Sequence, residues 1–432
     1  MTHHDQPLKH SRRAPQNPFA TVGRIALAII VVLAVSSTSV AAIAVWQTVG
    51  RIKPGIQLAQ LPGSTGVAVP SVGAIEGEVN LLLVGTDTRT NQGGAFSDSA
   101  NQDASSGLGN NDVTMLLHVS ADHTNATVVS FPRDLMVPVP KCPDPSGDGS
   151  SVAATDLAMF NTTLSRGGLS CTVLTVEKMT GLTIPYAAEI SFDGVIAMSN
   201  AVGGVTVCLA TDVTDSFTGL DLKAGNQTLV GDQALAFVRS RHGVGDGSDL
   251  GRISNQQVFL SSLMRKITSA GVLTNPLTLY SLANAAVTNM QLSTTLTDPT
   301  AMVAIALALK NISLSSMVFV QYPSVTDPDD VNRVIPNKSA ALLLNTALQK
   351  NQPISLTGGT GVAAEADPST TSTPTPTPTT APTSTADTTG TPTGTASPTD
   401  APTPTPSSTI VSLPTSVSGQ TAAEQTCTVG NN

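Results

Sequence analysis

Aromatic residues are scarce in this chain of 432 residues: they make up 3% of it, with a single tryptophan. The four cysteines include no Cys-x-x-Cys pair, which excludes a zinc ribbon and a thioredoxin-type motif. Three of the six histidines lie within the first ten residues, which argues against a multi-histidine metal site. A formal net charge of -9 argues against nucleic acid as a partner. What is plentiful is Val, Leu, Ile and Ala, enough for the core of one medium-sized α/β domain.

One uncharged and mostly apolar stretch runs from Ile25 to Trp46. As a helix it is long enough to cross about 30 Å of hydrocarbon. The basic residues before it are Lys9, Arg12, Arg13 and Arg24. The positive-inside rule therefore predicts a cytoplasmic tail over 1–24, a transmembrane helix over 25–46 and an extracellular remainder. The alternative is a cleaved signal peptide ending at Ala42-Ile43-Ala44, and both interpretations export the rest of the chain.

Composition divides the exported part into four segments. Residues 47–75 form a Gly/Pro/Ala/Val-rich linker, and residues 76–352 have a globular pattern. Residues 353–416 are dominated by Thr, Pro, Ser, Ala and Gly, so we expect a disordered stalk that cannot bury enough apolar surface to fold. This stalk suits either O-glycosylation or a bare spacer. A short end, 417–432, carries Cys427.

Short apolar runs alternate with helical periodicity in the globular segment. Strands are expected at 81–84, 113–119, 126–131 and 316–321, and helices at 172–180, 192–201, 249–268 and 301–310. This alternation predicts an α/β fold, with a central mixed β-sheet between helical layers in a three-layer α/β/α domain.

Polar side chains gather at the ends of these predicted strands. Asp87 and Arg89 directly follow the strand at 81–84, whereas Asp112 precedes the first strand of a hairpin and Arg133 follows its second strand. In an antiparallel hairpin these two ends share an edge, so Asp112 and Arg133 should be neighbours. If the strand at 81–84 runs parallel to 126–131, Asp87 and Arg89 reach the same edge, where open α/β sheets bind ligands.

Two further arginines, Arg239 and Arg241, close the apolar stretch 234–238. If this stretch is extended, residues two apart face the same side and both guanidinium groups enter one space. The alternative is that one of them pairs with Asp249 or Asp134 and only holds the loop.

The helix at 249–268 adds the remaining polar groups. Asp249, Arg252 and Gln256 stand at i, i+3 and i+7 and share one helical face. The first turn of this helix also offers free N–H groups and a positive dipole end.

So many arginines beside aspartates indicate a phosphate site. Arginine forks match phosphate oxygens, and Mg²⁺ is usually held by one or two carboxylates together with substrate oxygens. No Cys, His or Ser nucleophile pattern is present, which favours direct phosphoryl transfer catalysed by positioning and charge neutralisation. The alternative is a set of surface salt bridges, which is the usual fate of a single Arg–Asp pair.

The motifs of this region resemble those of the LytR-CpsA-Psr family, in order, over about residues 78–270. They are NLLLVGTDTR at 80–89, NDVTMLLHV at 111–119, SFPRD at 130–134, FN at 160–161 with GG at 167–168, VGGV at 202–205, GDQALAFVRSR at 231–241 and DLGRISNQQ at 249–257. The resemblance implies a Mg²⁺-dependent phosphotransferase. Such an enzyme moves a phosphoglycan from a polyprenyl-pyrophosphate carrier onto peptidoglycan, releases polyprenyl phosphate, and holds the lipid in an apolar tunnel between sheet and helices.

Site roles follow from the same resemblance. The positions that match metal ligands are Asp87 and Asp112. Those expected to bind pyrophosphate are Arg89, Arg133, Arg239, Arg241, Asp249, Arg252 and Gln256, and those expected in catalysis are Asp87, Asp112, Arg133, Arg239 and Arg241. Asn110 and Asn255 stand where the family often has arginine. They favour one alternative, a non-catalytic scaffold that binds the lipid or the wall. A pyrophosphatase that uses water as acceptor is a second alternative.

The cysteines fit an extracellular domain, where disulfides form. Cys142 follows the Pro-Arg-Asp motif and Cys171 begins a nearby predicted helix, so we predict that they pair. Cys208 would then pair with Cys427 and tie the end of the chain back to the domain.

Overall fold

The computed structural model describes residues 54–61, 75–90, 92–269, 282, 285–297, 299–368 and 409–431. The predicted membrane segment 25–46 and residues 369–408 lie outside the described residues. Within the described part, no helix combines the length and the apolar character that crossing a membrane requires.

The domain is built on a mixed sheet of seven strands in the order β13-β8-β1-β2-β3-β14-β20. Their bounds are β1 Val79–Thr86, β2 Asn111–Val119, β3 Ala126–Phe131, β8 Tyr186–Ile190, β13 Met290–Leu292, β14 Met317–Gln321 and β20 Gly419–Thr421. β2 pairs antiparallel with both β1 and β3, so β1 and β3 run in the same direction, as expected. The pairs β1–β8 and β3–β14 are parallel. The predicted mixed sheet is therefore confirmed.

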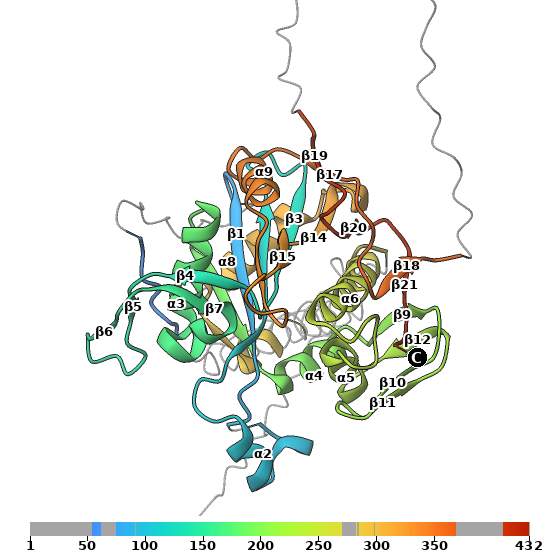
Figure 1. Ribbon diagram of the computed structural model, residues 1–432, viewed down its shortest axis with the longest axis horizontal. Helices are drawn as coiled ribbons and strands as arrows, with labels where there is room; N and C mark the ends of the chain where they lie inside the picture. The colour runs from blue at the N-terminus through green and yellow to red at the C-terminus, as the bar shows by residue number, and fades with distance from the viewer. Residues whose placement is uncertain are drawn as a thin grey trace, which may run out of the picture. The chain divides into compact units, whose positions relative to one another are not determined.

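Helices cover both faces of this sheet (Figure 1). They are α3 Thr163–Thr180, α4 Phe192–Ala201, α5 Asp232–Arg239, α6 Asp249–Ser269, α8 Pro299–Leu309 and α9 Lys338–Gln349. Successive strand residues point to opposite faces. Leu82 of β1 enters the main core with Val173 of α3 and Leu344 of α9, whereas Leu83 lines a cavity with Phe259 of α6. One face is thus filled by α3 and α9, and the other leaves a space under α4, α5 and α6.

Smaller elements complete the domain. They are α2 Ser99–Ala104, β4 Met136–Val139, β5 Cys142–Pro143, β6 Ser151–Val152, β7 Thr155–Met159, β9 Val205–Leu209, β10 Val213–Asp215, β11 Leu220–Leu222, β12 Gly225–Leu229, β15 Ser324–Thr326, β16 Val334–Pro336, β17 Ile354–Leu356, β18 Ala364–Ala366, β19 Val411–Leu413 and β21 Thr426–Thr428.

Helix ends follow local chemistry. α4 has the predicted bounds, and the side chain of its N-cap Ser191 accepts a hydrogen bond from the N–H of Gly194. α3 is longer than the expected 172–180 and begins at Thr163, because Gly167 and Gly168 adopt non-helical backbone angles that hide its first turn from the periodicity.

The prediction of an extended segment over 234–238 is wrong, because these residues belong to α5. Ala and Leu favour helix, and a short apolar run does not distinguish a buried strand from a helix face. Arg239 is the last residue of this helix, and Ser240 ends it in an extended conformation. The two arginines therefore do not share one face of a strand.

The predicted stalk over 353–416 is too long at both ends. β17 pairs with β19 and β18 pairs with β21, so chain on either side of residues 369–408 folds with the domain. These strands contain few large apolar side chains, but Ile354 and Leu413 are buried in the main core. β20, within the predicted end segment 417–432, forms an edge of the central sheet beside β14.

Both predicted disulfides are confirmed, Cys142–Cys171 and Cys208–Cys427. Cys427 of β21 lies opposite Cys208 of β9 in a parallel pair. The second bridge joins residues 219 positions apart. It therefore links the last strand, β21, covalently to its neighbour β9 within the small sheet β12-β9-β21-β18.

A buried histidine in β2 gives the fold a predictable dependence on pH. His118 is 2% exposed, its Nδ1 lies 2.7 Å from Oδ1 of Asn80, and burial lowers its pKa to about 4 against the opposing charge of Glu78. The folded state therefore resists protonation that the unfolded chain accepts. The free energy of unfolding therefore has its full value above about pH 6.5, where His118 is neutral in both states. It falls as the pH drops towards about 4, because the unfolded chain then binds the proton more readily. We expect the loss to be roughly 3 kcal/mol, from 1.36 kcal/mol per pKa unit.

Urea unfolding of the wild type and of His118→Gln at pH 7 and pH 4 measures this loss. Their difference isolates His118 from the carboxylates, which titrate in both proteins. If stability falls equally in both proteins, His118 is not responsible.

Candidate functional site

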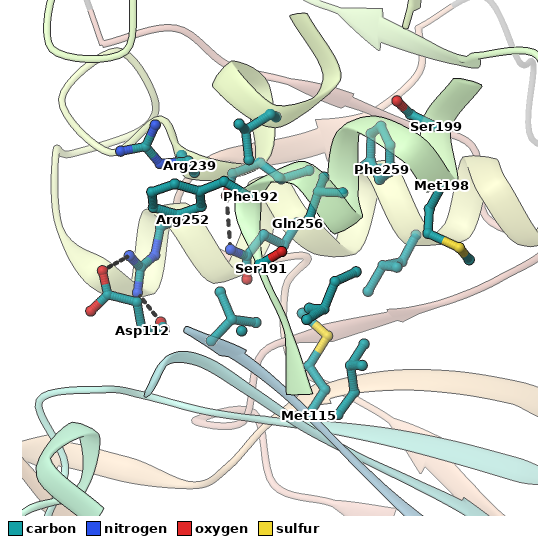
Figure 2. Close-up of a pocket in the computed structure, with 18 of the residues that line it drawn as sticks. Asp112, Met115, Ser191, Phe192, Met198, Ser199, Arg239, Arg252, Gln256 and Phe259 are labelled. Carbon is teal, nitrogen blue, oxygen red and sulfur yellow. Dashed lines mark hydrogen bonds and ion pairs between the residues drawn. The ribbon is translucent and has the colours of Figure 1, made fainter. Parts of the chain in front are cut away.

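A cavity of about 560 Å³ lies between the central sheet and α4, α5 and α6. Most of its wall is apolar, contributed by Leu83, Val113, Met115, Ile190, Val195, Met198, Val202, Val205, Leu235, Val238, Phe259, Leu260, Leu263, Ile267, Leu282 and Met290. Figure 2 shows Asp112, Arg239 and Arg252 together at one end and Met198 and Phe259 at the other. The cavity therefore combines a long apolar compartment with a charged end.

Five arginines line this cavity, namely Arg89, Arg133, Arg239, Arg241 and Arg252. They come from the segment after β1, the end of β3, the end of α5 and the first turn of α6. The lining also includes two carboxylates, Asp112 and Asp215, and Gln256. The structure thus brings together most of the residues predicted from the sequence.

Asp112 is the centre of an ion-pair network. Its Oδ1 lies 3.0 Å from a terminal nitrogen of Arg133, and its backbone oxygen accepts a 2.6 Å hydrogen bond from Arg252. The prediction that Asp112 and Arg133 are neighbours across the hairpin end is confirmed. The network fixes both guanidinium groups at the charged end of the cavity.

Asp249 lies behind this network and not on the cavity wall. Its Oδ1 is 2.5 Å from Arg252, the i, i+3 partner on α6, and its Oδ2 accepts a 3.1 Å hydrogen bond from the N–H of Arg133. Burial raises the pKa of the neighbouring Asp134, and the charge of Asp249 raises it further. Asp249 is therefore placed to orient two arginines of the cavity wall.

Arg239 is held by aromatic rings. Its guanidinium carbon lies 4.2 Å from the ring centroid of Phe192 and 5.3 Å from that of Phe96. Burial and the nearby charge of Arg89 lower the pKa of Arg239 from its ordinary value. Ring faces stabilise a cation without accepting its N–H groups in hydrogen bonds, so the N–H groups of Arg239 remain able to bind phosphate oxygens.

Arg241 also lines the cavity. Its Nε is buried and has no hydrogen-bond partner within the described part of the chain. The ion pairs of Asp134 and Asp249 are made with Arg133, Arg252 and Arg333, which counts against the alternative that Arg239 or Arg241 serves only to pair with them.

Sequence reasoning missed the aromatic support of Arg239. Phe96 lies in the loop between β1 and β2, where Gln92 and Gly93 exchange hydrogen bonds with Asp193 at the start of α4. The available signal was a single aromatic residue within a loop rich in Gly, Ser, Asn and Gln. Its partners, Phe192 and Arg239, are distant in the sequence, so no local pattern predicts that the Phe96 ring contacts them.

Asp87 lies at the expected edge of the sheet, although it is not part of the cavity lining. Its Oδ1 accepts hydrogen bonds from the N–H of Asn110 at 2.6 Å and from the hydroxyl of Ser105 at 3.1 Å. The amides of Asp87 and Asp112 both donate to the carbonyl of Asn110, which keeps the two aspartates at one edge of the sheet.

Asp87 and Asp112 are the carboxylates that the sequence assigns to a magnesium ion. Mg²⁺ takes one or two carboxylates and completes its shell with water and phosphate oxygens. The Oδ2 atoms of Asp87 and Asp112 make no hydrogen bond with any described residue, although that of Asp112 lies 3.9 Å from Arg252.

The two asparagines that replace expected arginines have structural partners. Asn255 is buried, donates to the carbonyl of Phe237 at 2.7 Å and accepts from Thr428 of β21 at 2.8 Å. Asn110 accepts a hydrogen bond from Ser165. Asn255 thus joins α6 to α5 and to the C-terminal strand, and neither asparagine lines the cavity.

Arg239→Lys tests the aromatic support directly. Lysine keeps the charge but loses the planar fork and its stacking over two rings, so we expect a roughly tenfold loss of activity, the effect of about 1.4 kcal/mol. Activity in the transfer reaction expected from the sequence and thermal melting are to be measured. The matched control is Arg166→Lys on α3, a partly buried arginine that donates to the carbonyl of Ala153 and lies outside the cavity lining. Transfer at the wild-type rate by a normally melting Arg239→Lys would remove Arg239 from the site.

Comparison with known proteins gives the chain a context. Residues 59–353 match the model of the LytR_cpsA_psr family. The chain is 30% identical over 292 residues to the cell wall biosynthesis protein LcpA of Corynebacterium glutamicum, covering 64% of this chain and 55% of that protein.

It is also 29% identical over 203 residues to the polyisoprenyl-teichoic acid–peptidoglycan teichoic acid transferase TagU of Bacillus mycoides, covering 47% of this chain and 57% of that protein. The chain therefore spans little more than half the length of these two relatives.

Solved structures include similar chains. One, described as TagT bound to LI-WTA, is 21% identical with a TM-score of 0.48, covering 68% of this chain and 98% of that one. Another, a LytR-Csp2A-Psr enzyme from Actinomyces oris, is 22% identical with a TM-score of 0.47, covering 68% of this chain and 96% of that one.

Proposed function

Because this chain belongs to the LytR_cpsA_psr family, we propose that it is a phosphotransferase that moves a phosphoglycan from a polyprenyl-pyrophosphate carrier onto peptidoglycan. The names of its relatives, a cell wall biosynthesis protein and a polyisoprenyl-teichoic acid–peptidoglycan transferase, support this class of reaction. The observation that carries the proposal is the cavity itself. It is apolar along most of its wall and is lined by five arginines, two of which, Arg133 and Arg252, pair with Asp112.

This arrangement matches the two parts of such a donor. An isoprenoid chain gains free energy from entering the apolar compartment under α6, at about 25 cal/mol per Å² of surface removed from water. The pyrophosphate carries the negative charge that the arginines at the other end can neutralise with bidentate hydrogen bonds. The surplus of arginines over carboxylates on the wall favours an anionic ligand.

In the proposed reaction a hydroxyl of peptidoglycan attacks the phosphorus that bears the glycan. A new O–P bond forms to the acceptor, and the bond from that phosphorus to the bridging oxygen breaks. The hydroxyl proton passes to the leaving phosphate or to water, and polyprenyl phosphate leaves. Arg133, Arg239 and Arg241 would hold the pyrophosphate oxygens in line and stabilise the charge that moves onto the leaving group. Asp112 and Asp249 orient Arg133 and Arg252 for this task.

We propose that Asp87 and Asp112 hold Mg²⁺ together with substrate oxygens. When bound there, the ion would offset negative charge on the pyrophosphate. Isothermal titration of Mg²⁺ into the protein in the presence of geranylgeranyl pyrophosphate tests this assignment without relying on activity.

We further propose that the chain is anchored by residues 25–46, with its N-terminus in the cytoplasm and the catalytic domain outside the cell. The uncharged apolar stretch and its preceding basic residues support this orientation. All four cysteines pair in two disulfides, which suits an oxidising compartment.

Mass spectrometry of lipid extracted from the purified full-length protein tests the cavity assignment. We expect a polyprenyl phosphate or pyrophosphate at near-equal molar ratio, and loss of this lipid in Met115→Trp, which narrows the apolar compartment. Recovery of bilayer lipids alone, in equal amount from both proteins, would contradict a dedicated carrier site.

A further inference from the structure

Two exposed rings stack where the cavity opens. Phe217, in the turn between β10 and β11, is 76% exposed, and its ring centroid lies 4.3 Å from that of His242 with an interplanar angle of 30°. Both residues line the cavity, and His242 directly follows Arg241. An exposed phenylalanine beside a phosphate site is an apolar surface that a ligand can cover.

A buried carboxylate holds these rings in place. Asp215 is 2% exposed, and its Oδ2 accepts hydrogen bonds from the hydroxyl of Ser240 at 2.8 Å and from the amides of Arg241 and Gly243 at 3.2 Å each. Its Oδ1 accepts one from the amide of Phe217 at 3.0 Å. Asp215 therefore ties the turn that carries Phe217 to the segment that carries Arg241 and His242.

Two properties indicate that this support is built for a charged Asp215. Burial would raise its pKa, but the hydrogen bonds from Ser240, Phe217, Gly243 and Arg241 bring the pKa below the ordinary value. The segments also approach closely, because a Cβ on Gly243 would lie 2.7 Å from the carbonyl oxygen of Thr214. The backbone segments that carry the two rings are thus tied to the backbone of Arg241.

We propose that the stacked faces of Phe217 and His242 bind the sugar that is joined to the pyrophosphate of the donor. This inference rests on the proposed function. With the isoprenoid in the apolar compartment and the pyrophosphate on Arg241, the first sugar lies next to the phosphorus and must leave through the opening. A pyranose ring presents a face of C–H groups, which packs on aromatic rings, while its hydroxyl groups remain free to meet water and polar side chains.

The surroundings favour a sugar over a membrane surface. Asp221 of β11, in the same hairpin as Phe217, and Asp246, four residues after His242, are exposed carboxylates. Anionic lipid headgroups are repelled by such groups, whereas sugar hydroxyls donate hydrogen bonds to them. The hydroxyl of Thr218, which also lines the cavity, adds a neutral polar group beside Phe217.

Calorimetric titration of the full-length protein with two probes tests the proposal. One probe is geranylgeranyl pyrophosphate, and the other is the same lipid pyrophosphate carrying N-acetylglucosamine. We expect the wild type to bind the sugar-bearing probe more tightly. Phe217→Ala should lose about fivefold to tenfold in affinity for that probe, the scale of an aromatic contact, and bind the sugar-free probe as the wild type does.

Three controls make the outcome decisive. Phe217→Tyr, which keeps the ring, should restore the affinity, and Leu342→Ala, which removes another exposed apolar side chain on α9, should change neither affinity. Arg241→Ala should weaken the binding of both probes.

Equal weakening of the binding of both probes by Phe217→Ala, or no effect on either, overturns the proposal and leaves the proposed function standing. Failure of the wild type to bind either probe refutes the proposed function, and the sugar site falls with it.

Discussion

Replacing Asp112 by asparagine is expected to lower phosphoglycan transfer by about 10²–10³-fold, the scale of losing one preorganised electrostatic group in an active site. Asp112 pairs with Arg133 at 3.0 Å and is one of the two proposed metal ligands. Asparagine keeps the size of the side chain, and the backbone oxygen that holds Arg252 is retained. The loss should therefore appear in the transfer rate and in its response to Mg²⁺, with little change in thermal melting.

Asp122→Asn is the matched control, since Asp122 lies in the turn at the far end of the same hairpin and is exposed. Transfer rates are to be measured across a Mg²⁺ titration for the wild type and both variants. A wild-type rate and an unchanged Mg²⁺ response in Asp112→Asn would show that the metal and the charge-neutralising group lie elsewhere.

Replacing Arg252 by methionine is expected to lower the free energy of unfolding by roughly 3–5 kcal/mol, the usual cost of leaving one member of a buried ion pair without its partner. The side chains of Arg252 and Asp249 are each 7% exposed. Methionine fills similar space, so the main loss is the close ion pair of Asp249, whose carboxylate keeps only its contacts with Arg133. Urea unfolding at pH 7 measures the effect.

Removing both charges should recover much of this loss, because a buried pair replaced as a whole is often close to neutral. The double variant Arg252→Met with Asp249→Asn tests that expectation, and Asp249→Asn alone completes the cycle. A change below about 0.5 kcal/mol in Arg252→Met, the range of ordinary surface substitutions, would show that the pair does not stabilise α6 against the sheet.

The hairpin end and the first turn of α6 could be predicted from the sequence because their geometry is local or nearly so. Antiparallel pairing places Asp112 beside Arg133, and the helical repeat places Asp249 beside Arg252. Neither inference needed knowledge of distant chain. The roles assigned to these residues in catalysis remain predictions.

What could not be predicted depends on tertiary partners. The short segment 234–238 was compatible with either a strand or a helix, and only its packing under α6 makes it α5. Asp87 follows β1 as expected, yet its carboxylate is taken by the amide of Asn110 and the hydroxyl of Ser105. β20 and β21 pair with strands far away in the sequence. Each has only three residues and few apolar side chains, so hydrophobic periodicity could not predict either pairing.

The central claim is tested most directly by following the full-length protein with a radiolabelled polyprenyl-pyrophosphoryl disaccharide, in the presence and absence of peptidoglycan fragments. The account predicts that label joins the peptidoglycan through a phosphodiester while an equal amount of polyprenyl phosphate is released, and that Arg241→Ala abolishes both. Equal release of polyprenyl phosphate without peptidoglycan, with the label recovered as free glycan phosphate, would instead show a pyrophosphatase that uses water. Tight binding of the donor with no release under either condition would show a scaffold, and either result would contradict the transferase.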